Sequence, residues 1–315
     1  MKQSIIESKI SNKIVSTDSL PKGVVKISFS QYNVFKSCPY RWYLTYGKKL
    51  YPFSSSVDTV FGTALHETLQ KYIHLLYKEG VGQSNKFNYS EFLLESLKKN
   101  YKLEKEKNDG NHFTDSATLH EYYEDGIEIM RWIVKNRIKI FDNKNIELVG
   151  IEIPILTKVD DNNDNIWFTA FLDIVFYDKI NDTYLVIDAK TSKEGWNKYA
   201  KKDENKIAQL LLYKKFFSKQ FGVPEDKIEV EFMICRRKIM EDAPYPIPRV
   251  QRFVPANGAL KVKQAFIDVT RFIHECYDYD GNIVEKQYSK DPGDKKKNCR
   301  FCPFNGTELC DGKKS

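Results

Sequence analysis

Two charged residues interrupt an apolar stretch of the sequence, YLVIDAKTSK at residues 184–193. Asp188 and Lys190 are two positions apart, and since side chains alternate between the faces of a β-strand, both point to the same face. Leu, Val, Ile and Ala surround them, so we expect at least one face of this strand to be buried. Because charges are costly to bury, this pair calls for a functional explanation.

A second acid, Asp173, is expected to face this pair. The preceding strand and this one are joined by the polar turn DKINDT. If Tyr177 pairs with Tyr184, Asp173 lies directly opposite Asp188, and the Cβ atoms of such opposed residues are about 4.5–5.5 Å apart. A register shifted by one residue would place the two acids on opposite faces.

Two opposed carboxylates repel each other unless positive charge lies between them. Lys190 could contribute, but a hard divalent cation such as Mg²⁺ or Mn²⁺ suits carboxylate oxygens better and keeps waters for chemistry. A metal held by two acids beside a lysine is suited to phosphodiester hydrolysis. The metal polarises the phosphate and activates water, while the lysine orients that water or offsets the developing charge. The alternative is a surface hairpin with solvated charges, which the apolar neighbours disfavour.

A second group of candidate ligands lies near the C-terminus, in CRFCPFNGTELC. Disulfides are rare in a reducing cytoplasm, so Cys299, Cys302 and Cys310 favour a metal site. A C-x-x-C spacing lets two thiolates reach one metal centre, and three cysteines leave a four-coordinate site one ligand short. Cys38, in SCPYRWYL, is the natural fourth ligand. The two other cysteines lie in apolar patterns and are expected to be buried thiols: Cys235 and Cys276.

The hydrophobic pattern predicts a mixed α/β scaffold for these residues. An amphipathic helix is expected over residues 60–80, and Ser28 or Ser30 is the candidate N-cap of an earlier helix. Three strands of a meander, a helix, a fourth strand and a last helix follow, over residues 146–159, 166–178, 183–191, 204–222, 227–237 and 258–279. We therefore expect a mixed central sheet flanked by helices, with a helical N-terminal elaboration.

Composition limits the possible functions only loosely. The chain has 315 residues and a net charge of +7, which fits a polyanionic partner but equally a Lys-rich soluble protein. It contains no run of eighteen apolar residues and no long apolar core of a signal peptide near its start, so we expect a cytoplasmic protein that does not cross a membrane. No G-x-x-x-x-G-K-[ST] motif is present, so helicase activity is not expected.

Together the motifs resemble the PD-(D/E)XK nuclease superfamily, and within it the RecB-like or AddB-like exonucleases that carry an iron–sulfur cluster, among them phage and CRISPR-associated proteins. FGTALHETL is similar to the family's Gly-x-x-x-His helix, FLDIVFYD to its acid strand, VIDAKTS to its D-x-K strand and QLLLY to its Q-x-x-x-Y helix. Taken singly, each motif also fits an ordinary helix or strand. Their order along the chain carries the resemblance, which spans residues 28–310.

The resemblance implies a restriction-endonuclease-like fold and a role for each matched residue. The implied metal ligands are His66, Asp173, Asp188 and the carbonyl of Ala189, with Lys190 as the catalytic lysine. Gln209 and Tyr213, which share one face of a helix, would position DNA or the lysine, and Glu152 is a supporting acid. The implied ligands of a 4Fe–4S cluster in the tail are Cys38, Cys299, Cys302 and Cys310. Zinc remains the alternative, and the seven residues between Cys302 and Cys310 exceed the family's usual spacing.

Four segments follow from this interpretation: a flexible N-terminus (1–22), a helical region (23–145), a nuclease core (146–290) and a cysteine tail (291–315). Past the D-x-K strand, residues 193–206 mix aromatic residues with lysines, which suits single-stranded nucleic acid, although a solvated surface is the simpler explanation.

We therefore predict a metal-dependent deoxyribonuclease that hydrolyses phosphodiester bonds from DNA ends, with single-stranded DNA as its substrate, in recombination, replication or repair. CRISPR spacer processing is a narrower option. A structure-specific or flap endonuclease, or a non-catalytic DNA-binding protein with a structural metal centre, is the alternative. Candidate protein partners are a recombinase, a helicase or a single-strand-binding protein, in the cytoplasm of the cell or of a phage host.

Overall fold

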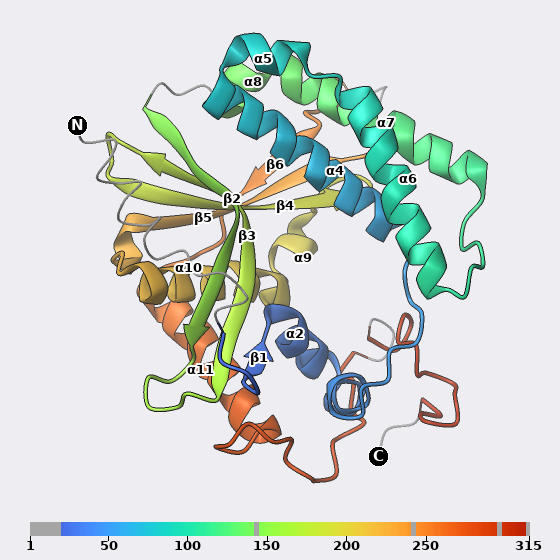
Figure 1. Ribbon diagram of the computed structural model, residues 1–315, viewed down its shortest axis with the longest axis vertical. Coiled ribbons are helices and arrows are strands. Elements are labelled where there is room, and N and C mark those ends of the chain that lie inside the picture. The colour runs from blue at the N-terminus through green and yellow to red at the C-terminus, as the bar shows by residue number, and fades with distance from the viewer. Residues whose placement is uncertain (1–19, 142–144, 241–243, 295–297, 313–315) are drawn as a thin grey trace.

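A twisted mixed β-sheet lies between two layers of helices in the computed structural model, which describes residues 20–141, 145–240, 244–294 and 298–312 (Figure 1). Most of the N-terminus that we expected to be flexible, residues 1–19, lies outside these ranges. The layers have separate apolar cores, one on each face of the sheet. None of the helices in the described ranges is long and apolar enough to cross a membrane.

The sheet has six strands in the order β1-β3-β4-β5-β6, with β2 paired to β3. Their bounds are β1 Val25–Ile27, β2 Ile146–Lys158, β3 Ile166–Asp178, β4 Thr183–Ser192, β5 Ile228–Arg236 and β6 Val250–Phe253. β1 on β3 and β4 on β5 are parallel pairs, while the other pairs are antiparallel. The predicted mixed sheet and its three-stranded meander are therefore confirmed. Two short strands, β1 and β6, were not predicted, and β1 lies inside the region expected to be helical.

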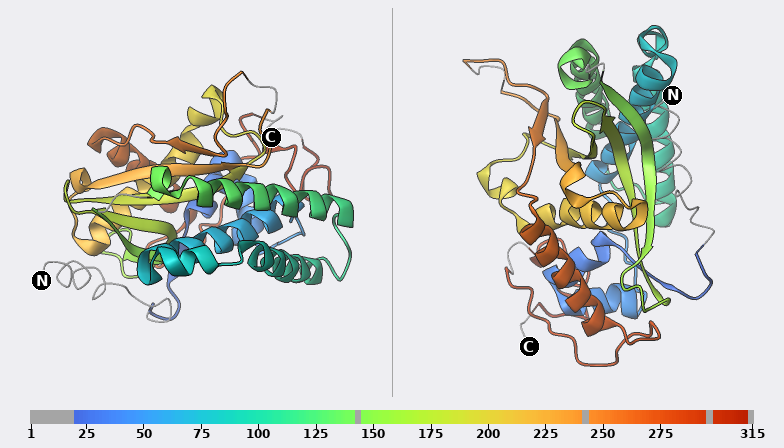
Figure 2. Two further views of the ribbon diagram at one scale, coloured as in Figure 1. Left: turned by 90° about the horizontal axis from the view of Figure 1, so that it is seen from above. Right: turned by 90° about the vertical axis from the view of Figure 1, so that its left-hand side faces the viewer.

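Three long helices cover one face of the sheet: α4 Val57–His74, α6 Tyr89–Lys107 and α7 Ser116–Lys135 (Figure 1). The other face carries α2 Phe29–Ser37, α10 Glu204–Phe221 and α11 Ala259–Cys276, and Figure 2 shows the two helical layers on opposite sides of the strands. Short helices and turns complete the structure: α3 Pro39–Trp42, a π-helical turn Tyr43–Gly47, a π-helical turn Leu75–Glu79, α5 Val81–Lys86, α8 Arg137–Phe141, α9 Lys198–Lys201 and a 3₁₀ turn Glu225–Lys227.

Local signals in the sequence account for several helix ends. Ser28 caps α2 by accepting a hydrogen bond from the backbone N–H of Gln31 (3.3 Å), as predicted. Asp203 caps α10, and Gly222 ends that helix in the left-handed conformation that glycine adopts without strain. The helix predicted over residues 60–80 begins slightly earlier and ends in a π-helical turn.

Candidate active site

The site lies where the sheet forks. β2 pairs along nearly the whole of β3, so the two other partners of β3 must share its opposite edge. On that edge β4 pairs with residues 174–178 and β1 with residues 166–168. The predicted pair Tyr177–Tyr184 is present, and the β3–β4 ladder ends at Ile174–Ile187, just before Asp173. β3 and β4 therefore separate beyond this pair, at Asp173 and the residues before it in β3 and at Asp188 and the residues after it in β4.

At the fork, side chains replace the missing strand-to-strand hydrogen bonds. The backbone N–H of Ala189 donates to Oδ2 of Asp173 (2.8 Å), and the carbonyl of Ala189 accepts from Nε2 of His66 (2.7 Å). Because that carbonyl can only accept, Nε2 carries a hydrogen, and Nδ1 of His66 faces Oδ2 of Asp173 at 3.7 Å. Three residues that the resemblance assigns to a metal therefore lie in direct contact, although His66 comes from a helix and the others come from two strands.

Asp188 lies deeper, with only 2% of its side chain exposed. Nζ of Lys190 is 2.7 Å from Oδ2 of Asp188 and forms an ion pair with it. The carboxyl of Asp173 is 15% exposed. Burial, and next the charge of Asp188, raise the pKa of Asp173 to about 6, although His66, Lys190 and the N–H of Ala189 act in the opposite direction. The charge of Asp188 thus disfavours the charge of Asp173, as expected for a carboxylate that requires a cation.

Helix α10 reaches the same place from the other face of the sheet. Nε2 of Gln209 donates to Oη of Tyr213 (2.8 Å), so the predicted pair one turn apart does interact. Burial, and next the charge of Asp188, hold the pKa of Tyr213 well above its usual range. Tyr213 is therefore a neutral phenol near the buried acid.

Gln70 is a site residue that the sequence analysis missed. It lies one helical turn after His66, and its amide nitrogen donates to Oε1 of Glu152 and approaches the carbonyl oxygen of Asp173 (3.5 Å). Glu152 falls opposite Asp173 in the β2–β3 ladder and has a φ of +51°, which is a strained conformation for a residue with a Cβ. The spacing of four residues from His66 was the available signal, since positions i and i+4 share a helical face.

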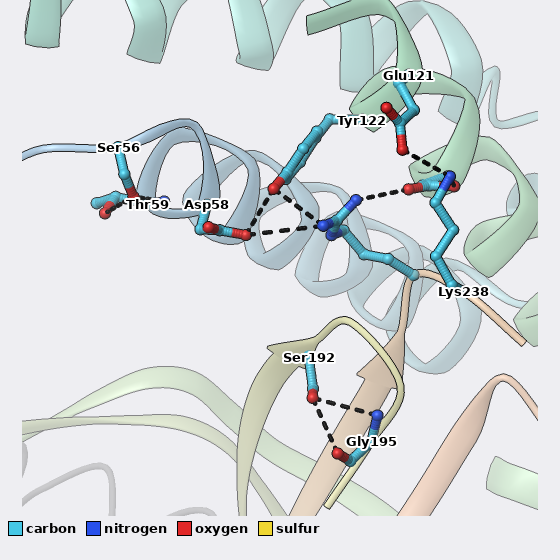
Figure 3. Close-up of polar contacts among 10 residues, drawn as sticks. Ser56, Asp58, Thr59, Glu121, Tyr122, Ser192, Gly195 and Lys238 are labelled. Carbon is cyan, nitrogen blue, oxygen red and sulfur yellow. Dashed lines mark hydrogen bonds and ion pairs between the residues drawn. The ribbon is translucent and has the colours of Figure 1, made fainter. Parts of the chain in front are cut away.

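A charge network centred on the buried pair Arg237 and Asp125 fastens the helices to the strand ends beside the site (Figure 3). The backbone N–H of Arg237 donates to the carbonyl of Ser192, at the end of the D-x-K strand (2.9 Å). Its guanidinium donates to Asp125 (2.7 Å) and to Oη of Tyr122 (2.9 Å), both on α7. Oη of Tyr122 donates in turn to Asp58, in the first turn of α4 (2.8 Å). The network therefore holds the helix that carries His66 against the strand that carries Lys190.

The donor set at the fork suits a hard divalent cation in type: two buried carboxylates, an imidazole nitrogen and a backbone carbonyl. Within the part of the chain that the structure describes, no three His, Cys, Asp or Glu side chains are gathered closely enough to form a metal-binding group. The ammonium of Lys190 provides the positive charge beside Asp188.

The four predicted cluster cysteines line one small cavity between the N-terminal helices and the tail, together with Arg41 and Lys290. Burial raises the pKa of the Cys38 thiol, and the neighbouring Cys302 and Cys310 add to this. The carbonyl of Ser289 accepts from the backbone N–H of residue 40 (3.0 Å), which ties the two segments together. These thiols likewise form no gathered metal-binding group among the described residues. The two other cysteines are buried, as predicted.

Comparisons with known proteins identify the family of the chain. The sequence profile described as the PD-(D/E)XK nuclease superfamily matches residues 26–310. Among solved structures, the crystal structure of SSO0001 is similar over 87% of this chain and 91% of that chain, at 14% identity and with a TM-score of 0.33. No curated protein matches the chain.

Proposed function

The chain belongs to the PD-(D/E)XK nuclease superfamily, and on this basis we propose that it is a RecB-like or AddB-like exonuclease that hydrolyses DNA from its ends. Nucleases of this superfamily typically use Mg²⁺ or Mn²⁺, so the enzyme is a metal-dependent nuclease. One observation supports the assignment of its site above all others: His66, Asp173 and Ala189 are in mutual contact at the fork of the sheet, next to Asp188 and Lys190.

In this proposal each residue at the fork has a separate task. His66, Asp173, Asp188 and the carbonyl of Ala189 hold the metal, which polarises the phosphate and activates water when bound. Lys190, whose side chain is 35% exposed, keeps its ammonium at the solvent side of the buried acids, where it orients the attacking water or offsets charge on the phosphate. Gln209 and the neutral Tyr213 position DNA or the lysine from α10.

We further propose that Cys38, Cys299, Cys302 and Cys310 hold a 4Fe–4S cluster, with zinc as the alternative occupant. Two observations support a thiolate-bound centre: the four cysteines line one cavity, and two cations, Arg41 and Lys290, line it with them. Positive neighbours offset the negative charge that thiolate ligands bring. Such a centre would join the N-terminal helices to the tail, so its loss should affect folding more than chemistry.

The deciding experiment uses end-labelled linear and covalently closed circular single-stranded DNA with Mn²⁺. Wild type, Lys190→Ala and a control, Lys179→Ala, whose lysine pairs with Glu147 at the surface, are purified without oxygen. We expect wild type and the control to degrade linear DNA only, and Lys190→Ala to bind DNA without cutting it. The position of the label then gives the polarity of digestion.

Two outcomes would overturn the proposal in different ways. Cleavage of closed circles by wild type would indicate an endonuclease acting on flaps or other structures. If all three proteins bind DNA and none of them cleaves it, the chain is a binding protein with a structural metal centre. The setting we propose is recombination, replication or repair in the cytoplasm, alongside a recombinase, a helicase or a single-strand-binding protein.

A further inference from the structure

The segment that leaves the D-x-K strand, residues 193–206, carries more lysines than acidic residues. Its lysine cluster consists of Lys193, Lys198, Lys201 and Lys202. Within the described ranges none of the four forms an ion pair, in contrast to lysines such as Lys179 and Lys215. Their contacts are with aromatic rings: Nζ of Lys198 lies 5.1 Å from the centroid of the Tyr199 ring, and Nζ of Lys201 lies 5.7 Å from that of Phe253. Of the three acids in the same stretch, Asp203 is engaged at the N-terminus of α10 by accepting from the N–H of Asn205 (3.1 Å). The cluster is therefore available to an anionic partner.

The backbone that presents this cluster is held firmly. Oγ of Ser192 donates to the carbonyl of Gly195 (3.1 Å) and accepts from its N–H (3.2 Å), which closes the turn after β4 (Figure 3). Gly195 has a φ of +92°, and a Cβ there would lie 2.4 Å from Nε of Arg236, so only glycine fits this turn. The side chain of Gln251 then holds both the N–H (2.7 Å) and the carbonyl (3.1 Å) of Trp196.

The two aromatic residues of the segment differ in what they can do. The ring of Trp196 packs against Phe232, with centroids 4.7 Å apart, so it anchors the segment from within. Tyr199 is 72% exposed on α9, and α9 lies at the edge of the molecule in both views of Figure 2. The side chain of Asn197 accepts from the N–H groups of Tyr199 and Ala200 (3.0 Å each), which fixes the start of this short helix.

We propose that the exposed ring of Tyr199 stacks on a base of single-stranded DNA, while the lysine cluster beside it binds the phosphates. This inference rests on the proposed function and specifies its substrate. An aromatic ring among unpaired lysines matches the chemistry of single strands, because each nucleotide offers a flat base and one negative phosphate. A duplex keeps its bases stacked on each other, so it cannot use Tyr199 in this way. Tyr199 and the lysine cluster together form the proposed platform, which follows the strand that carries Lys190 and precedes the helix that carries Gln209.

Binding of a fluorescent oligothymidylate, measured by anisotropy in EDTA so that no cleavage occurs, tests the proposal. Stacking of one base is worth about 1–3 kcal/mol, so Tyr199→Ala should raise the Kd roughly 5- to 150-fold at tenfold per 1.36 kcal/mol. Tyr199→Phe, which keeps the ring, should bind as wild type does. The control is Tyr279→Ala, which removes another tyrosine that is 67% exposed, just beyond the end of α11. Affinity for a blunt duplex should not change in any variant.

The salt dependence separates the two parts of the platform. Each phosphate contact to a single strand contributes about 0.7 to the slope of log K against log salt. A triple variant with Lys198, Lys201 and Lys202 changed to Ala should therefore lower this slope by about 2, whereas Tyr199→Ala should leave it unchanged.

The proposal is wrong if Tyr199→Ala binds oligothymidylate as tightly as Tyr279→Ala does, or if it loses duplex affinity to the same extent. The proposed function is judged separately, by cleavage with Mn²⁺. If the protein binds single strands through Tyr199 but does not cleave DNA, the proposed binding site stands and the proposed nuclease function is wrong.

Discussion

Replacing Asp173 by Asn should stabilise the metal-free protein while it abolishes cleavage. The carboxyl is largely buried opposite a second acid, and its pKa is raised to about 6 from an ordinary value of 3.8, first by burial and then by Asp188. An acid that binds its proton more tightly in the folded protein than in the unfolded chain loses stability when it ionises. The cost is absent below about pH 4, grows between about pH 4 and 6, and is complete above that range.

The size of the effect follows from the shift in pKa. About two pKa units correspond to about 3 kcal/mol between the two protonation states. Asn has nearly the same shape, and its Oδ1 can still accept from the N–H of Ala189, so Asp173→Asn removes the charge and little else. The free energy of unfolding at pH 8 should therefore rise by up to about 3 kcal/mol. At roughly 2 °C per kcal/mol for a large domain, Tm should rise by up to about 6 °C.

The assay is thermal unfolding in EDTA at pH 8 and pH 5, followed by the same series with Mn²⁺. We expect the advantage of Asp173→Asn to be largest at pH 8 and smaller at pH 5. Because a metal that binds only the folded state stabilises it, Mn²⁺ should raise the Tm of wild type and close the gap. A suitable control is Asp161→Asn. Because Lys219 holds the pKa of that exposed carboxyl below its usual range, this variant should not be more stable than wild type.

Two results would refute this reasoning. If Asp173→Asn is less stable than wild type at pH 8 in EDTA, the carboxylate is a structural hydrogen-bond acceptor and not a strained ligand. If the gap is the same at pH 5 and pH 8, the stabilisation does not come from ionisation of Asp173.

Three further variants probe the surroundings of the site. Asp125→Ala leaves the guanidinium of Arg237 buried without its main partner, so the free energy of unfolding, measured in urea, should fall by about 3–5 kcal/mol. A decrease of less than about 1 kcal/mol would mean that the network does not fasten the helices. Glu152→Gly should be more stable than Glu152→Ala by about 1 kcal/mol in thermal unfolding, because the φ of +51° strains any residue with a Cβ; equal stabilities would contradict this. Cys38→Ala, purified without oxygen, should lose bound iron or zinc by metal analysis and melt at a lower temperature, whereas Cys235→Ala, a buried thiol, should retain its metal.

The sequence predicted the strands whose signals are local and long. The polar turn between β3 and β4 set the register Tyr177–Tyr184, because a short turn leaves few ways to pair the flanking residues. The strands β1 and β6 have three and four residues, too few for a period of two to be recognised. β1 becomes a strand only because β3 extends past the end of β4 and offers it a free edge, which is a tertiary effect.

Local signals in the sequence likewise predicted only part of the candidate site. Residue types and spacing identified Asp173, Asp188 and Lys190, but neither the fork nor the contacts of His66 can be read from spacing, because they depend on two strands that separate. Gln70 was missed although it lies one turn from His66, since an amide on a helix has no distinctive signature in a sequence. In the sequence Trp196 and Tyr199 are equivalent aromatic residues, whereas in the structure Trp196 packs against Phe232 and Tyr199 is an exposed ring.

The fork explains why a buried acid pair and two helices on opposite faces can form one site. Inside a continuous sheet, the N–H and C=O of Ala189 would pair with β3, and a helix on one face could not reach a carboxylate that points to the other. Where β3 and β4 separate, those two backbone groups must find other partners or remain unsatisfied, which is costly in a buried place. Asp173 and His66 supply them. The hydrogen bonds that compensate for the broken ladder therefore also hold the proposed metal ligands in place, so we expect changes at the fork to alter stability and cleavage together.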